Sequence, residues 1–137
     1  MQLNIASDKT MGQVQDEFTS FFPNLKLVFF TKAHDAYKGS PAKFLISGHD
    51  TLLSTMSARV PASAVLLMEL EMPVWQFERL FENEYGLHVQ VFRRSGNTWL
   101  ETSVSDDLTL EEQEAKAEAS LVKNFEIVDP LDYRDQD

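Results

Sequence analysis

One pattern constrains the fold of this chain more than any other. A short β-prone run, an amphipathic helix and a second β-prone run occur twice, in the same order. In the first unit the alternating run Leu3-Asn4-Ile5 precedes a helix expected from about Met11, and residues 25–30 are rich in strand formers. In the second unit residues 65–70 precede a helix expected from about Pro73, and residues 87–92 follow it.

The two expected helices can also be superposed on each other. A constant offset pairs Met11 with Val74, Val14 with Phe77, Phe18 with Phe81, Phe22 with Tyr85, and the stop signal Pro23 with Gly86. We interpret this match as a structural duplication. The alternative is that any two amphipathic helices of similar length align this well.

These elements predict an α+β fold. We expect the two strand-helix-strand units to form one mixed sheet with helices on one face, in a ferredoxin-like arrangement, with a β-grasp arrangement as the alternative. The expected core positions are Ile5, Val14, Phe18, Phe22, Leu27, Leu67, Phe77, Phe81, Leu87, Val89, Val91 and Leu100.

The domain organisation follows from the same elements. We expect one domain over residues 1–128, with the first unit at 1–30, a structured insertion at 31–63, and the second unit with a hairpin at 64–104. An acidic helix is expected at 108–123, an edge strand at 125–128 and a disordered acidic tail at 129–137. The pairs Thr10/Gln13 and Thr109/Glu112 have capping-box spacing, so each is expected to begin a helix. Within the insertion, residues 44–47 are apolar enough for a hairpin or short strand.

The net charge of −10 is concentrated at the C-terminal end. Residues 1–100 carry ten acidic and nine basic side chains, whereas residues 101–137 carry twelve acidic and three basic ones. This distribution disfavours nucleic-acid binding, which requires clustered Lys and Arg. The sequence contains no cysteine and no apolar run of membrane-spanning length, so we expect a cytoplasmic protein without disulfides or membrane contact.

A glycine turn after residue 92 predicts a β-hairpin. Whether the two-residue loop is Ser95-Gly96 or Gly96-Asn97, Phe92 and Trp99 fall on one face, and Val91 and Leu100 fall on the other. Phe92 and Trp99 share their face with Arg94. If no helix covers them, Phe92, Arg94 and Trp99 form a binding patch for a partner protein or a second copy of the chain; the alternative is that a helix or the insertion covers them.

The hairpin and the acidic helix after it carry a resemblance. The segment from Gly86 to Gln113, including Val89-Gln90-Val91-Phe92-Arg93-Arg94-Ser95-Gly96-Asn97-Thr98-Trp99-Leu100-Glu101-Thr102, resembles a segment of a family of small uncharacterised bacterial proteins. The resemblance implies a bacterial source. It implies no activity and no ligand.

Catalytic motifs are scarce. The dipeptides His34-Asp35 and His49-Asp50 offer imidazoles and carboxylates that suit a divalent metal, but His-Asp beside glycine is also common turn chemistry. Glu78 and Glu82 lie one turn apart on a helix, and we expect them on its solvated face. No nucleophile elbow, dinucleotide fingerprint or phosphate-binding loop occurs, so no cofactor is expected.

We therefore expect a non-catalytic protein-interaction or regulatory module. The alternatives are a small-ligand sensor, with a pocket lined from both units, and a metal-dependent hydrolase using His34, Asp35, His49 and Asp50.

Overall fold

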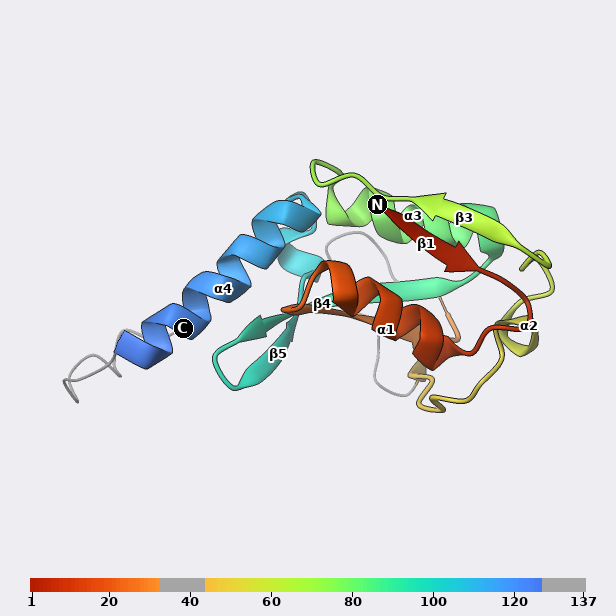
Figure 1. Ribbon diagram of the computed structural model, residues 1–137, viewed down its shortest axis with the longest axis horizontal. Helices are drawn as coiled ribbons and strands as arrows, with labels where there is room; N and C mark the ends of the chain where they lie inside the picture. The colour runs from red at the N-terminus through yellow and green to blue at the C-terminus, as the bar shows by residue number, and fades with distance from the viewer. Residues whose placement is uncertain (33–43, 127–137) are drawn as a thin grey trace.

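The computed structural model describes residues 1–32 and 44–126. Along the chain, the elements are β1 (Gln2–Ile5), α1 (Met11–Phe21), β2 (Leu25–Phe30), α2 (Leu53–Met56), β3 (Ala64–Leu67), α3 (Val74–Tyr85), β4 (His88–Ser95), β5 (Thr98–Glu101), a 3-10 turn (Ser103–Ser105) and α4 (Leu110–Glu126). Figure 1 shows that the β4–β5 hairpin and α4 lie together at one end of the molecule.

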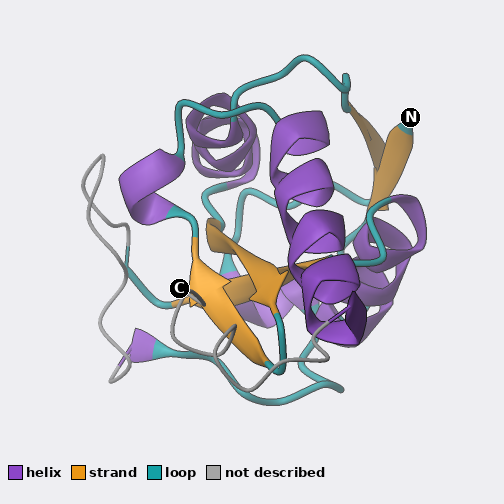
Figure 2. Ribbon diagram, turned by 90° about the vertical axis from the view of Figure 1, so that its left-hand side faces the viewer, coloured by secondary structure: helices purple, strands orange, loops and turns teal. Residues whose placement is uncertain are grey.

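The α+β class is confirmed, but the strands lie in two sheets. β1 pairs with β3, and β2, β4 and β5 form a second sheet in the order β2-β4-β5. All three pairings are antiparallel. Figure 2, seen from the end where the hairpin lies, shows the β1–β3 pair apart from the three-stranded sheet. The ferredoxin-like arrangement is therefore not confirmed.

The edge of β1 that does not pair with β3 lies against α1. A ferredoxin-like sheet places the first strand between two others. Here the backbone N–H of Asn4 donates instead to the Glu17 carboxylate of α1 at 2.6 Å, and the Asn4 side chain donates to the same carboxylate at 2.9 Å. This edge of β1 thus bonds to a helix side chain rather than to another strand.

Each element of the first unit lies against its counterpart in the second. β1 pairs with β3, β2 pairs with β4, and the Phe18 ring of α1 stacks on Phe77 of α3 at 5.3 Å between centroids. Phe81 extends this aromatic contact to Phe29 on β2, edge to face at 6.1 Å. Mutual contact of counterparts is what a duplicated unit with approximate twofold symmetry would give, and the duplication itself stays a prediction.

Ten of the twelve expected core residues are buried, and the predictions for Leu67 and Leu100 are wrong because both side chains are exposed. Leu67 is 63% exposed, whereas its neighbours Leu66 and Met68 are buried. The register of β3 on β1 pairs Leu3 with Leu66, and because side chains alternate along a strand, Leu67 faces outward. Leu100 is 40% exposed because β5 pairs only with residues 92–95 of β4, beyond the main core.

Both expected capping boxes are confirmed. The Thr10 hydroxyl accepts the Gln13 N–H at 3.2 Å, and the Gln13 side chain accepts the Thr10 N–H at 2.9 Å. Thr109 and Glu112 make the same reciprocal pair at the start of α4, at 3.1 and 2.9 Å. These bonds satisfy backbone donors that a helix cannot pair internally.

Residues 44–63 of the insertion pack against the rest of the fold. In place of a hairpin this segment contains the short helix α2 and isolated bridges that join Phe30 to Leu45 and Thr10 to Leu52. At the other end of the chain, residues 125 and 126 continue α4 rather than beginning a strand, and the expected tail at 129–137 lies outside the described residues. Within 1–32 and 44–126, no helix is long and apolar enough to cross a membrane.

Candidate functional site

The β4–β5 hairpin brings the three expected binding residues to one face. Its register pairs Phe92 with Glu101 and Arg94 with Trp99, and the chain turns at residues 96–97. Gly96 has a φ of 59°, a left-handed conformation that suits a tight hairpin turn. Phe92, Arg94 and Trp99 therefore share a face, as the sequence predicts.

A fourth residue, Lys26 of β2, belongs to the same face. Lys26 lies directly opposite Phe92 across the β2–β4 pair. Its ammonium nitrogen is 4.7 Å from the centroid of the Trp99 ring and 5.8 Å from that of Phe92, which is cation–π geometry. No local sequence pattern points to Lys26, because its position depends on a strand pairing between distant segments. We call the surface of Lys26, Phe92, Arg94 and Trp99 the Trp99 face.

The Trp99 face remains partly open to solvent. Trp99 is 36% exposed, Arg94 is exposed and Phe92 is half-buried. α4 holds the hairpin at its turn, where the Ser120 hydroxyl accepts the Gly96 N–H at 3.1 Å while it donates to the Ala117 carbonyl of its own helix at 2.7 Å. This contact fixes the hairpin without burying its tryptophan.

The charge of this face differs from that of the chain as a whole. Lys26 and Arg94 place two cations beside the aromatic rings, with the Glu101 carboxylate opposite Phe92 and Asp16 of α1 lining a hollow together with Lys26. The chain carries a net charge of −10. An anionic group approaching the molecule would thus find at the hairpin a local cationic site with apolar surface beside it.

A hollow of about 400 Å³ adjoins this face. Lys26 and Val28 of β2 line one side, Gln15 and Asp16 of α1 line another, and residues 45–47 with His49 also contribute. Because Lys26 belongs to both features, the Trp99 face continues into a groove beside β2.

The histidine pairs do not gather into a site among the described residues. His34 and Asp35 lie outside the described residues, and His49 and Asp50 are exposed. Over 1–32 and 44–126, no three His, Cys, Asp or Glu side chains are placed to hold a metal ion.

His49 has a structural contact instead. Its carbonyl accepts the Gly12 N–H at 2.9 Å, and its ring covers Gly12 so closely that a Cβ there would lie 2.0 Å from the imidazole Nδ1. The His49-Asp50 turn thus packs on the first turn of α1. This accounts for the glycine at position 12.

Glu78 was expected on the solvated face of its helix, and this prediction is wrong. Glu78 is buried, and its carboxylate accepts the Val91 N–H at 2.8 Å and a longer bond from the Gln90 side chain at 3.4 Å. β5 pairs with β4 only from residue 92 onward, so the edge of β4 before that residue needs another hydrogen-bond partner. Glu78 supplies it.

Comparison with known proteins adds no identification: no protein-family model, no curated protein and no solved structure matches this chain.

Proposed function

We propose that this protein is a non-catalytic interaction module, and that its Trp99 face binds an acidic segment of a partner protein carrying at least one apolar side chain. The observation that carries the proposal is the partly exposed Trp99 ring with the Lys26 ammonium 4.7 Å from its centroid. The ring offers apolar contact area, and Lys26 and Arg94 offer charge at its border.

The residue types of this face support binding. Tryptophan and arginine are the side chains most often found to dominate the energetics of protein interfaces. Because they lie on a rigid hairpin, less conformational entropy is lost when a partner binds. The turn bond to Ser120 and the pairing of β4 with β2 provide that rigidity.

Charge determines the kind of partner. Lys26 and Arg94 attract carboxylates, and such complementarity speeds encounter and rejects partners of like charge. In a twofold dimer formed through this face, each copy would place its Lys26 and Arg94 against those of the other, which like-charge repulsion opposes. We therefore take a different protein as the occupant.

The test selects peptides rather than assuming one. A displayed random-peptide library is panned on the wild-type protein and counter-selected on Trp99→Ala. We expect enriched peptides rich in Asp, Glu and apolar residues, whose affinity falls by roughly tenfold or more with Trp99→Ala or Arg94→Ala, as hot-spot residues do.

The chain offers a matched control. Trp75, at the start of α3, is the other tryptophan and is 41% exposed. Trp75→Ala removes a ring of the same size and similar exposure, so it should leave binding unchanged. Recovery of no peptide that distinguishes Trp99→Ala from the wild type would overturn the proposal, as would equal losses in the two variants. A concentration-dependent mass that Trp99→Ala abolishes would assign the face to a second copy instead.

A second function, small-ligand sensing, is favoured by a separate hollow that touches both strand-helix-strand units.

A further inference from the structure

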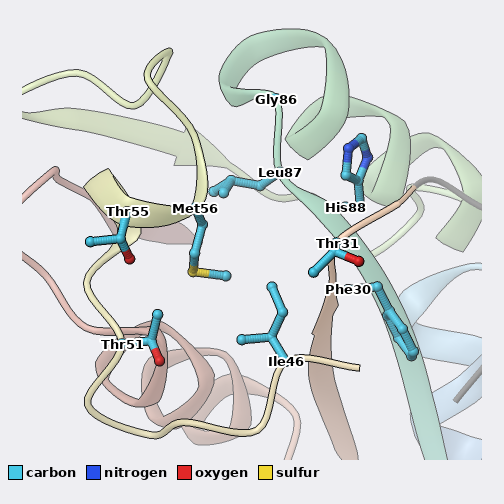
Figure 3. A pocket seen from close by; sticks show the side chains of 9 residues that line it. All are labelled: Phe30, Thr31, Ile46, Thr51, Thr55, Met56, Gly86, Leu87 and His88. Atoms are coloured by element: carbon cyan, nitrogen blue, oxygen red, sulfur yellow. The ribbon is translucent and has the colours of Figure 1, made fainter. Parts of the chain in front are cut away.

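A hollow of about 310 Å³ lies between the end of β2, the insertion and the start of β4. It is lined by Phe30, Thr31, Ile46, Thr51, Thr55, Met56, Gly86, Leu87 and His88. Figure 3 shows the Met56 and Ile46 side chains projecting toward each other across it, with Thr51 and Thr55 on one side and Thr31 on the other. Ligand pockets in proteins begin at about this volume.

Hydrogen bonds hold the walls in place. The Ile46 N–H donates to the Phe29 carbonyl at 2.9 Å, which fixes the insertion to β2. On the far side, the Ser57 hydroxyl donates to the Tyr85 carbonyl at 2.6 Å, and the Arg59 guanidinium donates to the Glu82 carbonyl at the end of α3. The hollow is therefore preformed, and a ligand would not have to order its walls.

Gly86 allows Ser57 of the insertion to lie close to the end of α3. Its φ is 66°, and a Cβ at this position would lie 2.7 Å from the Ser57 hydroxyl. A left-handed glycine at the end of α3 both ends that helix and leaves room for the segment that forms the wall.

The lining chemistry defines the ligand. Phe30, Ile46, Met56 and Leu87 supply apolar surface, and Ile46 and Met56 are only partly buried in the free protein. Three threonines contribute hydroxyl groups that can donate or accept, and His88 contributes an imidazole. The described residues that line the hollow include no carboxylate, lysine or arginine. Among these described residues an ionised ligand would find no carboxylate, lysine or arginine to offset the hydration that it loses, which opposes binding.

We propose that this hollow is a binding site for a small uncharged molecule with an aromatic or branched apolar body and one hydroxyl or similar hydrogen-bonding group. Its volume of about 310 Å³ is near the lower end for ligand pockets, which favours a small ligand. The site does not depend on the Trp99 face. Along β4, His88 at the hollow is about 13 Å from Phe92, the first residue of that face on this strand, at 3.3 Å per residue.

The test uses benzyl alcohol as an uncharged probe, with benzoate and benzylamine as charged analogues of the same ring. Amide signals of the 15N-labelled protein are followed by NMR during each titration. We expect benzyl alcohol to cause saturable shifts at Thr31, Ile46, Met56 and Leu87, with a Kd in about the millimolar range for so small a ligand. The two charged analogues should bind at least about tenfold more weakly.

Two neighbouring substitutions on α2 locate the site. Thr55→Trp fills the hollow and should abolish the saturable shifts, whereas Ser54→Trp adds the same bulk at an exposed position outside the lining and should preserve them. If Thr55→Trp fails to fold, Met56→Ala replaces it and should weaken benzyl alcohol binding by several-fold through lost apolar contact.

Three results would overturn the proposal: no saturable shift at the lining residues with benzyl alcohol, equal binding of the charged analogues, or unchanged binding in a folded Thr55→Trp or Met56→Ala protein. None of these results bears on peptide binding at the Trp99 face.

Discussion

At the scale of single residues, Glu78 shows how one side chain completes a sheet edge. Its carboxylate bonds the Val91 N–H where β5 no longer covers β4, so a helix residue replaces a missing strand. Helical spacing alone places Glu78 beside Glu82, and nothing local in the sequence shows where β5 ends. The burial of Glu78 was therefore beyond prediction from the sequence.

Glu78→Ala should destabilise the protein by about 1–3 kcal/mol, because it leaves a buried backbone donor without an acceptor. Glu78→Gln keeps an acceptor oxygen and should lose less. Denaturant unfolding measures both, with Glu84→Ala, an exposed glutamate of the same helix, as the control. Equal losses for Glu78→Ala and Glu84→Ala would refute this role.

The Tyr85 phenol should make the stability of the fold depend on pH in the alkaline range. Burial, with the carboxylate of Glu84 adding to it, raises the pKa of the Tyr85 phenol above its ordinary value of 10.0. The folded state thus favours the protonated phenol, so this contribution to stability is complete below about pH 10 and is lost as pH rises through the higher folded value. Unfolding measured from pH 9 upward should show a smaller alkaline decline in Tyr85→Phe than in the wild type. Identical slopes would contradict the raised pKa.

At the scale of elements, the sequence predicted those features that depend only on residues close together in the chain. The reciprocal bonds of Thr10 with Gln13 and of Thr109 with Glu112 follow from spacing alone. The face of the hairpin that carries Phe92 and Trp99 was also predictable, because either turn gives the same alternation. The inward face of β3 was not, since the run Val65 to Met68 is apolar throughout and only its pairing with β1 selects Leu66 and Met68.

The register of β3 can be tested with adjacent leucines. Leu66→Ala should destabilise the protein by about 2–5 kcal/mol because it leaves a cavity in the core. Leu67→Ala removes the same atoms from an exposed position and should change stability by less than about 0.5 kcal/mol. Chemical denaturation compares the two, and a larger loss for Leu67→Ala would mean that β3 presents its other face to the core.

At the scale of the whole molecule, the strand-helix-strand units were visible in the sequence but their arrangement was not. Strand order depends on pairings between segments far apart in the chain, such as β1 with β3 and β2 with β4. The same limit applies to the Trp99 face: Phe92, Arg94 and Trp99 come from one hairpin, whereas Lys26 joins them only through the β2–β4 pair. The hollow beside Met56 requires three distant segments and had no sequence signal beyond the expectation of a pocket touching both units.

The central claim is that a partner segment lies on Trp99, and tryptophan fluorescence tests it most directly. The chain has two tryptophans, so Trp75→Phe leaves Trp99 as the single reporter and Trp99→Phe leaves Trp75. Each single-tryptophan protein is titrated with a peptide selected on the wild type. We predict a saturable change in the emission of Trp99 in the Trp75→Phe protein and none in the Trp99→Phe protein. A peptide that binds the Trp75→Phe protein without changing its emission, or that changes only the emission of Trp75, would contradict the account.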